Sequence, residues 1–249
     1  MEKEEQLFRK RVRELAELCY AKDIPAHTDF LTLNEQTIFQ NISGTLPPVR
    51  FILSGGLPAS ERKIVCFLPS YEEEPSELPY ECLRISPVNR KFAEELTHRD
   101  YLGAVMNLGI ERSVIGDIII KNQDAFVFVL KKISRYLIGS LVMIRHTSVN
   151  VSVCETASEI PEPEFEEISG TVSSLRLDNM VALAGRLSRT KAAEYIQGEK
   201  VFINGQTAQS VSRLLKEGEI LSIRGIGKFL FAHAGGQTKK GRSSVIIKK

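Results

Sequence analysis

Hydrophobic positions in the first part of the chain change from helical to strand spacing. Between residues 4 and 21 they recur at intervals of three and four, which predicts an amphipathic helix. Thr32 followed by Glu35 is typical of a capping box, so a second helix is expected near 33–42. Two apolar runs separated by glycine and proline predict strands at 49–53 and 63–68. Residues 1–74 are therefore expected to form an N-terminal α+β domain, a small α/β module.

Strands and helices alternate beyond the polar, proline-containing run at 71–77, which marks a domain boundary. The pattern predicts strand, helix, strand, strand, helix and strand at 80–86, 90–108 (broken near His98), 114–120, 125–130, 131–140 and 142–153. This βαββαβ order is that of ferredoxin-like folds and of RNA-recognition motifs. We therefore expect a ferredoxin-like middle domain at 75–156.

Two aromatic residues of the middle domain admit two interpretations. RNA-recognition motifs stack bases on aromatic side chains of their central strands, and Phe126 and Phe128 fall on one face of a predicted strand. They could equally belong to the core, because Val127 and Val129 would then face the other way. The basic and glycine positions of the RNA-recognition signature are missing.

Carboxylates and prolines dominate residues 157–172, a composition that predicts an acidic linker. Residues 173–249 then predict two short helices and a small sheet, with a hairpin at Asn204-Gly205 and a basic tail that includes Lys239, Lys240 and Lys248. Asp178 is expected to open the first helix, Gly185 to take the left-handed position after it, and Ser188 to cap the second. The chain is thus predicted to be an α+β protein of three small domains.

Charge is distributed unevenly among these segments. Residues 1–90 carry a net charge of −3 and residues 91–170 a net charge of −4, whereas residues 171–249 hold 14 Lys+Arg against 5 Asp+Glu, a net charge of +9. Such asymmetry is typical of a nucleic-acid-binding segment, although a solvated basic surface without function would look the same. The second helix of this segment starts with Arg189 and Lys191, and cations at a helix start favour a role facing an anion such as phosphate.

Localisation and chemistry are constrained by what the sequence lacks. The start is too acidic for a secretory or transit signal, and no apolar run is long enough to cross a bilayer. The four cysteines and four histidines show no metal-ligand spacing, so free thiols in the cytoplasm are expected. His98-Arg99-Asp100 lacks the following asparagine of a kinase catalytic loop, and Ser54-Gly55-Gly56 lacks the end of a phosphate-binding loop. No catalytic residue, metal or cofactor is therefore predicted.

The basic segment resembles the RNA-binding domain named after small-subunit ribosomal protein S-four. The match rests on Arg176-Leu177-Asp178, Ser188-Arg189, Ala192, Ile196-Gln197-Gly198, Val201, Asn204-Gly205, Gly218 and Ile223-Arg224-Gly225, with Glu219 where that family usually has aspartate. Arg176 and Arg189 are the expected main phosphate contacts. The other expected RNA-binding residues are Arg186, Ser188, Thr190, Lys191, Arg213, Arg224 and Lys228.

The whole chain resembles the YlmH family of bacterial S-four-domain proteins. The added matches are Phe30-Leu31-Thr32, Glu35-Gln36, Gly55-Gly56, Glu61-Arg62, the run 98–103, the run 108–112 and Ile115-Gly116-Asp117. The resemblance implies a non-enzymatic protein that binds rRNA of the large ribosomal subunit and peptidyl-tRNA or tRNA, in ribosome-associated quality control. The family is also linked to cell-division genes. Two alternatives stay open: an RNA-modifying enzyme, such as a pseudouridine synthase or methyltransferase, and a cell-division scaffold. No membrane or small-molecule partner is expected.

Overall fold

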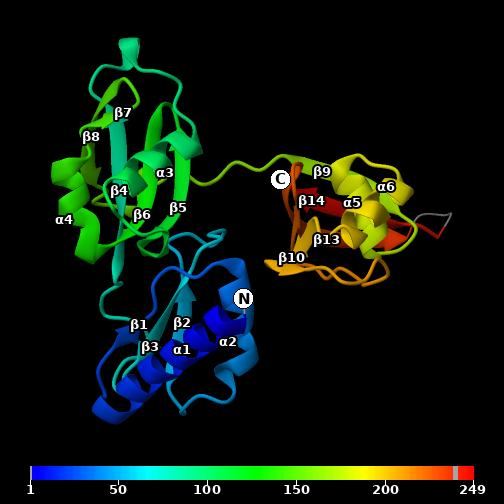
Figure 1. Ribbon diagram of the computed structural model, residues 1–249, viewed down its shortest axis with the longest axis horizontal. Coiled ribbons are helices and arrows are strands. Elements are labelled where there is room, and N and C mark those ends of the chain that lie inside the picture. The colour runs from blue at the N-terminus through cyan, green and yellow to red at the C-terminus, as the bar shows by residue number, and fades with distance from the viewer. Residues whose placement is uncertain (1, 238–240) are drawn as a thin grey trace. The chain divides into compact units, whose positions relative to one another are not determined.

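The computed structural model of the chain describes residues 2–237 and 241–249, and its elements are drawn in Figure 1. The chain divides into two compact units, Met1–Pro163 and Glu164–Lys249. None of the helices in the described ranges is long and apolar enough to cross a membrane.

The first part of unit one is a three-stranded antiparallel sheet with two helices. Its elements are α1 (Glu2–Lys22), β1 (Ala26–His27), α2 (Leu33–Ser43), β2 (Arg50–Ser54) and β3 (Ile64–Leu68), with strand order β1-β3-β2. The predicted capping box is confirmed: the Thr32 amide donates to Glu35 Oε2 at 2.7 Å, and the Glu35 amide donates to Thr32 Oγ1 at 3.3 Å. In Figure 1 both helices lie along the sheet. Phe39 of α2 and Phe67 of β3 are fully buried in the core of this part.

The second part of unit one has the predicted βαββαβ order. Its elements are β4 (Tyr80–Pro87), the 3-10 turn η1 (Arg90–Phe92), α3 (His98–Asn107), η2 (Arg112–Val114), β5 (Ile115–Lys121), β6 (Asp124–Leu130), α4 (Lys131–Ser140), β7 (Met143–Ile144) and β8 (Thr147–Val153). The strand order β5-β6-β4-β8-β7, antiparallel throughout, is the ferredoxin-like arrangement with one short strand added at the edge. The predicted helix break near His98 is also confirmed, because η1 and α3 are separate.

The two parts of unit one share a hydrophobic core, which the division at residue 74 did not anticipate. The rings of Phe30 and Tyr80 are 5.5 Å apart between centroids, and a Cβ atom at Gly56 would lie 2.0 Å from the Phe128 ring. Arg62 of the first part, a residue that is 8% exposed, donates from Nε to the Ile115 carbonyl of the second part at 3.0 Å. The stacking interpretation of the central strand is therefore wrong: Phe126 and Phe128 are buried, and the N-terminal part covers Phe128 on the face where bases would stack.

Unit two places two helices on one face of a six-stranded antiparallel sheet (Figure 1). Its elements are β9 (Glu167–Val172), α5 (Leu177–Gly185), α6 (Arg189–Gln197), β10 (Val201–Ile203), β11 (Gln206–Thr207), β12 (Ile220–Ile223), β13 (Gly227–Gln237) and β14 (Ser243–Lys248). The strand order in the sheet is β11-β10-β12-β13-β14-β9. The 3-10 turn η3 (Ala157–Glu159) belongs to the end of unit one. Asn204 and Gly205 have φ of 49° and 79°, as a tight hairpin turn requires, so the predicted hairpin is confirmed.

Two segments that were predicted as a linker and a tail form strands of this sheet. Within the expected linker 157–172, residues Glu167–Val172 form β9, and residues Ser243–Lys248 of the expected basic tail form β14, which pairs with both β13 and β9. β9 and β14 are far apart in the sequence, so a local pattern did not reveal their pairing. Lys239 and Lys240 of the expected tail lie outside the described residues.

Candidate nucleic-acid interface

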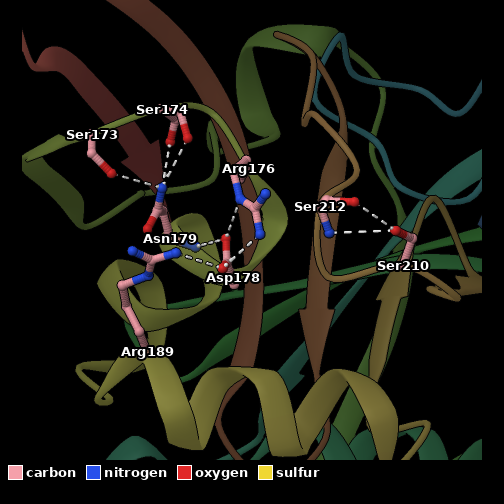
Figure 2. A network of polar contacts seen from close by, with 8 residues as sticks. All are labelled: Ser173, Ser174, Arg176, Asp178, Asn179, Arg189, Ser210 and Ser212. Atoms are coloured by element: carbon pink, nitrogen blue, oxygen red, sulfur yellow. Dashed lines mark hydrogen bonds and ion pairs between the residues drawn. The ribbon is translucent and has the colours of Figure 1, made fainter.

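A buried carboxylate at the start of α5 fixes two arginine side chains (Figure 2). Arg176 donates to both oxygens of Asp178, from Nε and from one terminal nitrogen, at 3.2 Å each, and a terminal nitrogen of Arg189 donates to Asp178 Oδ2 at 2.8 Å. The Asp178 side chain is 8% exposed, whereas those of Arg176 and Arg189 are 38% and 61% exposed. The carboxylate is therefore hidden, and both cations face solvent.

The ionisation of Asp178 follows from these contacts. Burial on its own would raise the pKa of this carboxyl, but hydrogen bonds from Arg176 and Arg189 outweigh burial and lower the pKa below its ordinary value. The carboxylate is therefore charged at neutral pH. Each guanidinium has five N–H groups; Asp178 accepts two from Arg176 and one from Arg189. The cluster thus orients two exposed forks that suit the geometry of a phosphate group.

The backbone around Asp178 explains why α5 starts here. The Leu177 amide donates to the Arg213 carbonyl at 2.8 Å, and the Asp178 amide donates to the Val211 carbonyl at 3.2 Å. These first amides of α5 are therefore bonded to the loop before β12. Only the side chains at this helix end are left to bind an anion. Buried Asn179 donates to Ser173 Oγ at 3.1 Å and to Ser174 Oγ at 3.0 Å, which holds the preceding loop (Figure 2).

The end of α5 and the start of α6 carry four more of the predicted residues. Ser188 caps this helix as predicted, because its Oγ accepts from the Lys191 amide at 3.2 Å. Lys191 Nζ bonds Glu194 at 2.8 Å, so this ammonium lies along its own helix, and Thr190 is exposed. Arg186 is 81% exposed, with a terminal nitrogen 3.9 Å from Glu166. Together with Arg176 and Arg189, these residues surround the junction between α5 and α6.

The prediction for Gly185 is wrong in one respect. The left-handed residue after α5 is Arg186, with φ of 51°, while Gly185 is the last helical residue. A Cβ atom at Gly185 would lie 3.1 Å from the Leu187 side chain and 3.2 Å from Ile226. Glycine therefore relieves a tight contact with these two side chains and does not serve a left-handed backbone conformation.

The last three predicted residues do not all join this junction. Arg213 bonds Glu219 at 2.9 Å, and its carbonyl touches the start of α5, so it borders the cluster. The Arg224 guanidinium lies 5.6 Å from the centre of the Phe202 ring. Lys228 pairs in register with Ser222. Ile223 is buried in the core, and side chains alternate along a strand, so Arg224, which follows Ile223, and Ser222, which precedes it, face the other side of the sheet. Lys228 shares that side because it pairs with Ser222.

Three residues at the candidate site were not predicted as site residues. Asp178 was expected only to begin a helix, whereas it is the anchor of both arginines. The exposed hydroxyls of Ser210 and Ser212 lie on the loop whose Val211 carbonyl accepts from Asp178 (Figure 2). The short spacing between Arg176 and Asp178 was a usable signal for the anchor; the serine loop gave none. In the described part of the chain, no group of three or more His, Cys, Asp or Glu side chains could hold a metal ion.

Two helices on one face of a small sheet, with exposed arginines fixed at the helix junction, define an RNA-binding protein of the S4-domain class. Residues 175–221 match the family model "S4 domain", and residues 80–158 match the model described as "Putative RNA-binding domain in YlmH".

Two relatives extend the match over most of the chain. "Ribosome-associated protein quality control protein P2" of Bacillus subtilis (strain 168) is 30% identical over 226 residues, which cover 89% of this chain and 86% of that protein. A solved structure, "Cell division protein ylmH from Streptococcus pneumoniae", has a TM-score of 0.51 at 24% identity and covers 64% of this chain and 95% of its own; it shows a likeness in fold. The chain belongs to the YlmH family.

Proposed function

We propose that this chain is a non-enzymatic, cytoplasmic protein that binds structured rRNA on the large ribosomal subunit, together with tRNA or peptidyl-tRNA. Its role would be ribosome-associated quality control of stalled complexes. The observation that carries the proposal is the pair of exposed guanidiniums held by buried Asp178. The name of the relative from Bacillus subtilis supports the ribosomal setting.

The electrostatics of the C-terminal segment suit this role. A net charge of +9 over residues 171–249 attracts a polyanion over a distance set by the salt concentration. Arg176 and Arg189 then supply directional bonds at a fixed place. Because side chains do not reach the bases through the deep groove of A-form RNA, we expect the protein to recognise backbone and shape.

Co-sedimentation with purified large ribosomal subunits tests the proposal. Arg189→Gln should raise the apparent Kd about tenfold at physiological salt and reduce the slope of log K against log salt by about one, as expected for one lost phosphate contact. Arg135→Gln is the matched control, because Arg135 is an exposed arginine on α4 in the other unit.

The outcomes separate the candidate functions. Unchanged binding of a folded Arg189→Gln variant would contradict the proposal. A rise in melting temperature on addition of S-adenosylmethionine would instead indicate an RNA-modifying enzyme. Retention of cellular position and partners after RNase treatment would indicate a scaffold at the division site.

A further inference from the structure

Unit one contains a second buried aspartate that holds two arginines. Arg84 donates to Asp124 Oδ2 from Nε at 3.0 Å and from a terminal nitrogen at 2.5 Å, and a terminal nitrogen of Arg90 lies 2.7 Å from Oδ1 and 2.9 Å from Oδ2. The Asp124 side chain is 5% exposed, and those of Arg84 and Arg90 are 40% and 50% exposed. The arrangement repeats the chemistry of the Arg176–Asp178–Arg189 cluster on an unrelated fold.

The second cluster lies on the sheet face opposite the helices. Arg84 in β4 pairs in register with Phe126 of β6 and with Ser152 of β8, so the three side chains share one face. The alternate positions Leu83 and Ile85 are buried in the core on the helix side. The Arg84 guanidinium lies over the Phe126 ring, 5.9 Å from the ring centre, and this cation–π contact helps to keep the guanidinium on the sheet surface.

Only part of this face is open. The N-terminal part of the unit covers the end that carries Tyr80 and Phe128. The end that carries Arg84 remains accessible, and the exposed side chains of Asn150 and Ser152 in β8 lie along it. The accessible strip therefore offers guanidinium, amide and hydroxyl groups, which can donate hydrogen bonds to an anion. An anion at Arg84 must compete with the carboxylate of Glu159, which interacts electrostatically with that guanidinium.

We propose that Arg84 and Arg90 form a second binding site for RNA phosphate groups, so that the chain holds RNA at one point on each unit. This inference rests on the proposed RNA-binding function and specifies how unit one takes part in it. Both guanidiniums bond the same carboxylate, which brings them close enough to grip one phosphate or two neighbouring ones. Recognition is of the backbone, because the N-terminal part covers Phe128, and the buried Phe126 ring lies beside the Arg84 guanidinium.

The cluster also ties η1 to the sheet, since Arg90 donates from its other terminal nitrogen to the Asn122 carbonyl at 2.6 Å. A test must separate that structural role from RNA binding. In the variant R84Q/R90Q the buried Asp124 loses both charged partners, so R84Q/R90Q/D124N is made as well; it removes the uncompensated carboxylate while keeping its shape. The control R99Q/R135Q removes two positive charges, as R84Q/R90Q does, but from exposed arginines on α3 and α4, which cover the other sheet face.

The measurement is fluorescence anisotropy of a labelled RNA hairpin with a single-stranded overhang, titrated with full-length protein across a salt series. Both cluster variants should weaken binding about tenfold and reduce the log–log salt slope by one to two, roughly one for each lost phosphate contact. The control should change Kd less than about threefold, since it removes distant charge only. R84K/R90K keeps the charge but loses the paired N–H donors of the guanidinium, so its Kd should lie between that of the wild type and that of R84Q/R90Q.

Arg189→Gln is measured in the same series, so that the two proposals can fail separately. If Arg189→Gln weakens binding and the folded triple variant binds as the wild type does, the inference is overturned and the proposed function stands. If only the cluster variants weaken binding, the second site stands and the assignment of the first fails. Equal effects of R84Q/R90Q and of R99Q/R135Q, which remove the same two positive charges, would show that charge alone acts, which also overturns the inference.

Discussion

Asp178→Asn separates charge from positioning at the central cluster. The substitution adds one positive charge to an already basic surface, so a mechanism based on charge alone predicts tighter RNA binding. At about 6 Å in water, one unit charge contributes roughly 0.7 kcal/mol, or about a threefold gain in affinity. If Asp178 acts by positioning the two arginines, binding should change in the opposite direction.

The opposite direction follows because an amide cannot hold both arginines. The asparagine side chain would offer one oxygen in place of two, and its NH₂ group would face N–H donors of Arg176 and Arg189. Binding must then order two free side chains at about 0.5–1.5 kcal/mol each. Set against the charge gain, the net expectation is a loss of affinity of about tenfold.

The assay is anisotropy or co-sedimentation at two salt concentrations, with urea unfolding run in parallel. The free energy of unfolding should fall by only about 1–2 kcal/mol, because the two arginines are substantially exposed and solvent screens their bonds. Tighter binding by a folded Asp178→Asn variant would refute the positioning role of Asp178.

Three further predictions concern stability. Because the pKa of Asp178 is lowered in the folded state, its stabilisation is present above about pH 4 and is lost as pH falls through the folded-state pKa, so acid titration should bring wild type and Asp178→Asn together; a constant difference would contradict this. Gly56→Ala, at φ of 98° and against Phe128, should cost about 3 kcal/mol in urea unfolding, whereas Gly44→Ala, in open space, should cost under about 1 kcal/mol; equal costs would refute the shared core. Deletion of residues 243–249 removes two buried side chains of β14 and should destabilise unit two by about 3–6 kcal/mol; unchanged thermal unfolding would show that β14 is dispensable.

Local signals in the sequence predicted local structure well. The capping box at Thr32, the cap at Ser188 and the hairpin at Asn204 each depend on residues within a few positions of one another. The alternating order of elements in the second part of unit one also predicted a ferredoxin-like sheet, because a βαββαβ sequence has few compact arrangements.

Features that depend on distant contacts were not predicted. The pairing of β9 with β14 joins segments at opposite ends of unit two, and the burial of Phe128 depends on a loop near Gly56. At the candidate site, the sequence supplied Arg176 and Arg189 but not the carboxylate that joins them, since Asp178 had a sufficient local explanation as a helix-start residue. Arg224 likewise lies apart from that cluster because its side chain is on the sheet face opposite the helices, and only the structure shows this.

The central claim is that Arg176 and Arg189 grip RNA phosphates while Asp178 holds them in place. A structure of the full-length protein on purified large ribosomal subunits tests it most directly. We expect phosphate oxygens within hydrogen-bonding distance, about 2.7–3.2 Å, of both guanidiniums, with the contacts to Asp178 retained. A bound protein whose α5–α6 junction faces solvent, with no nucleotide near either arginine, would contradict the claim.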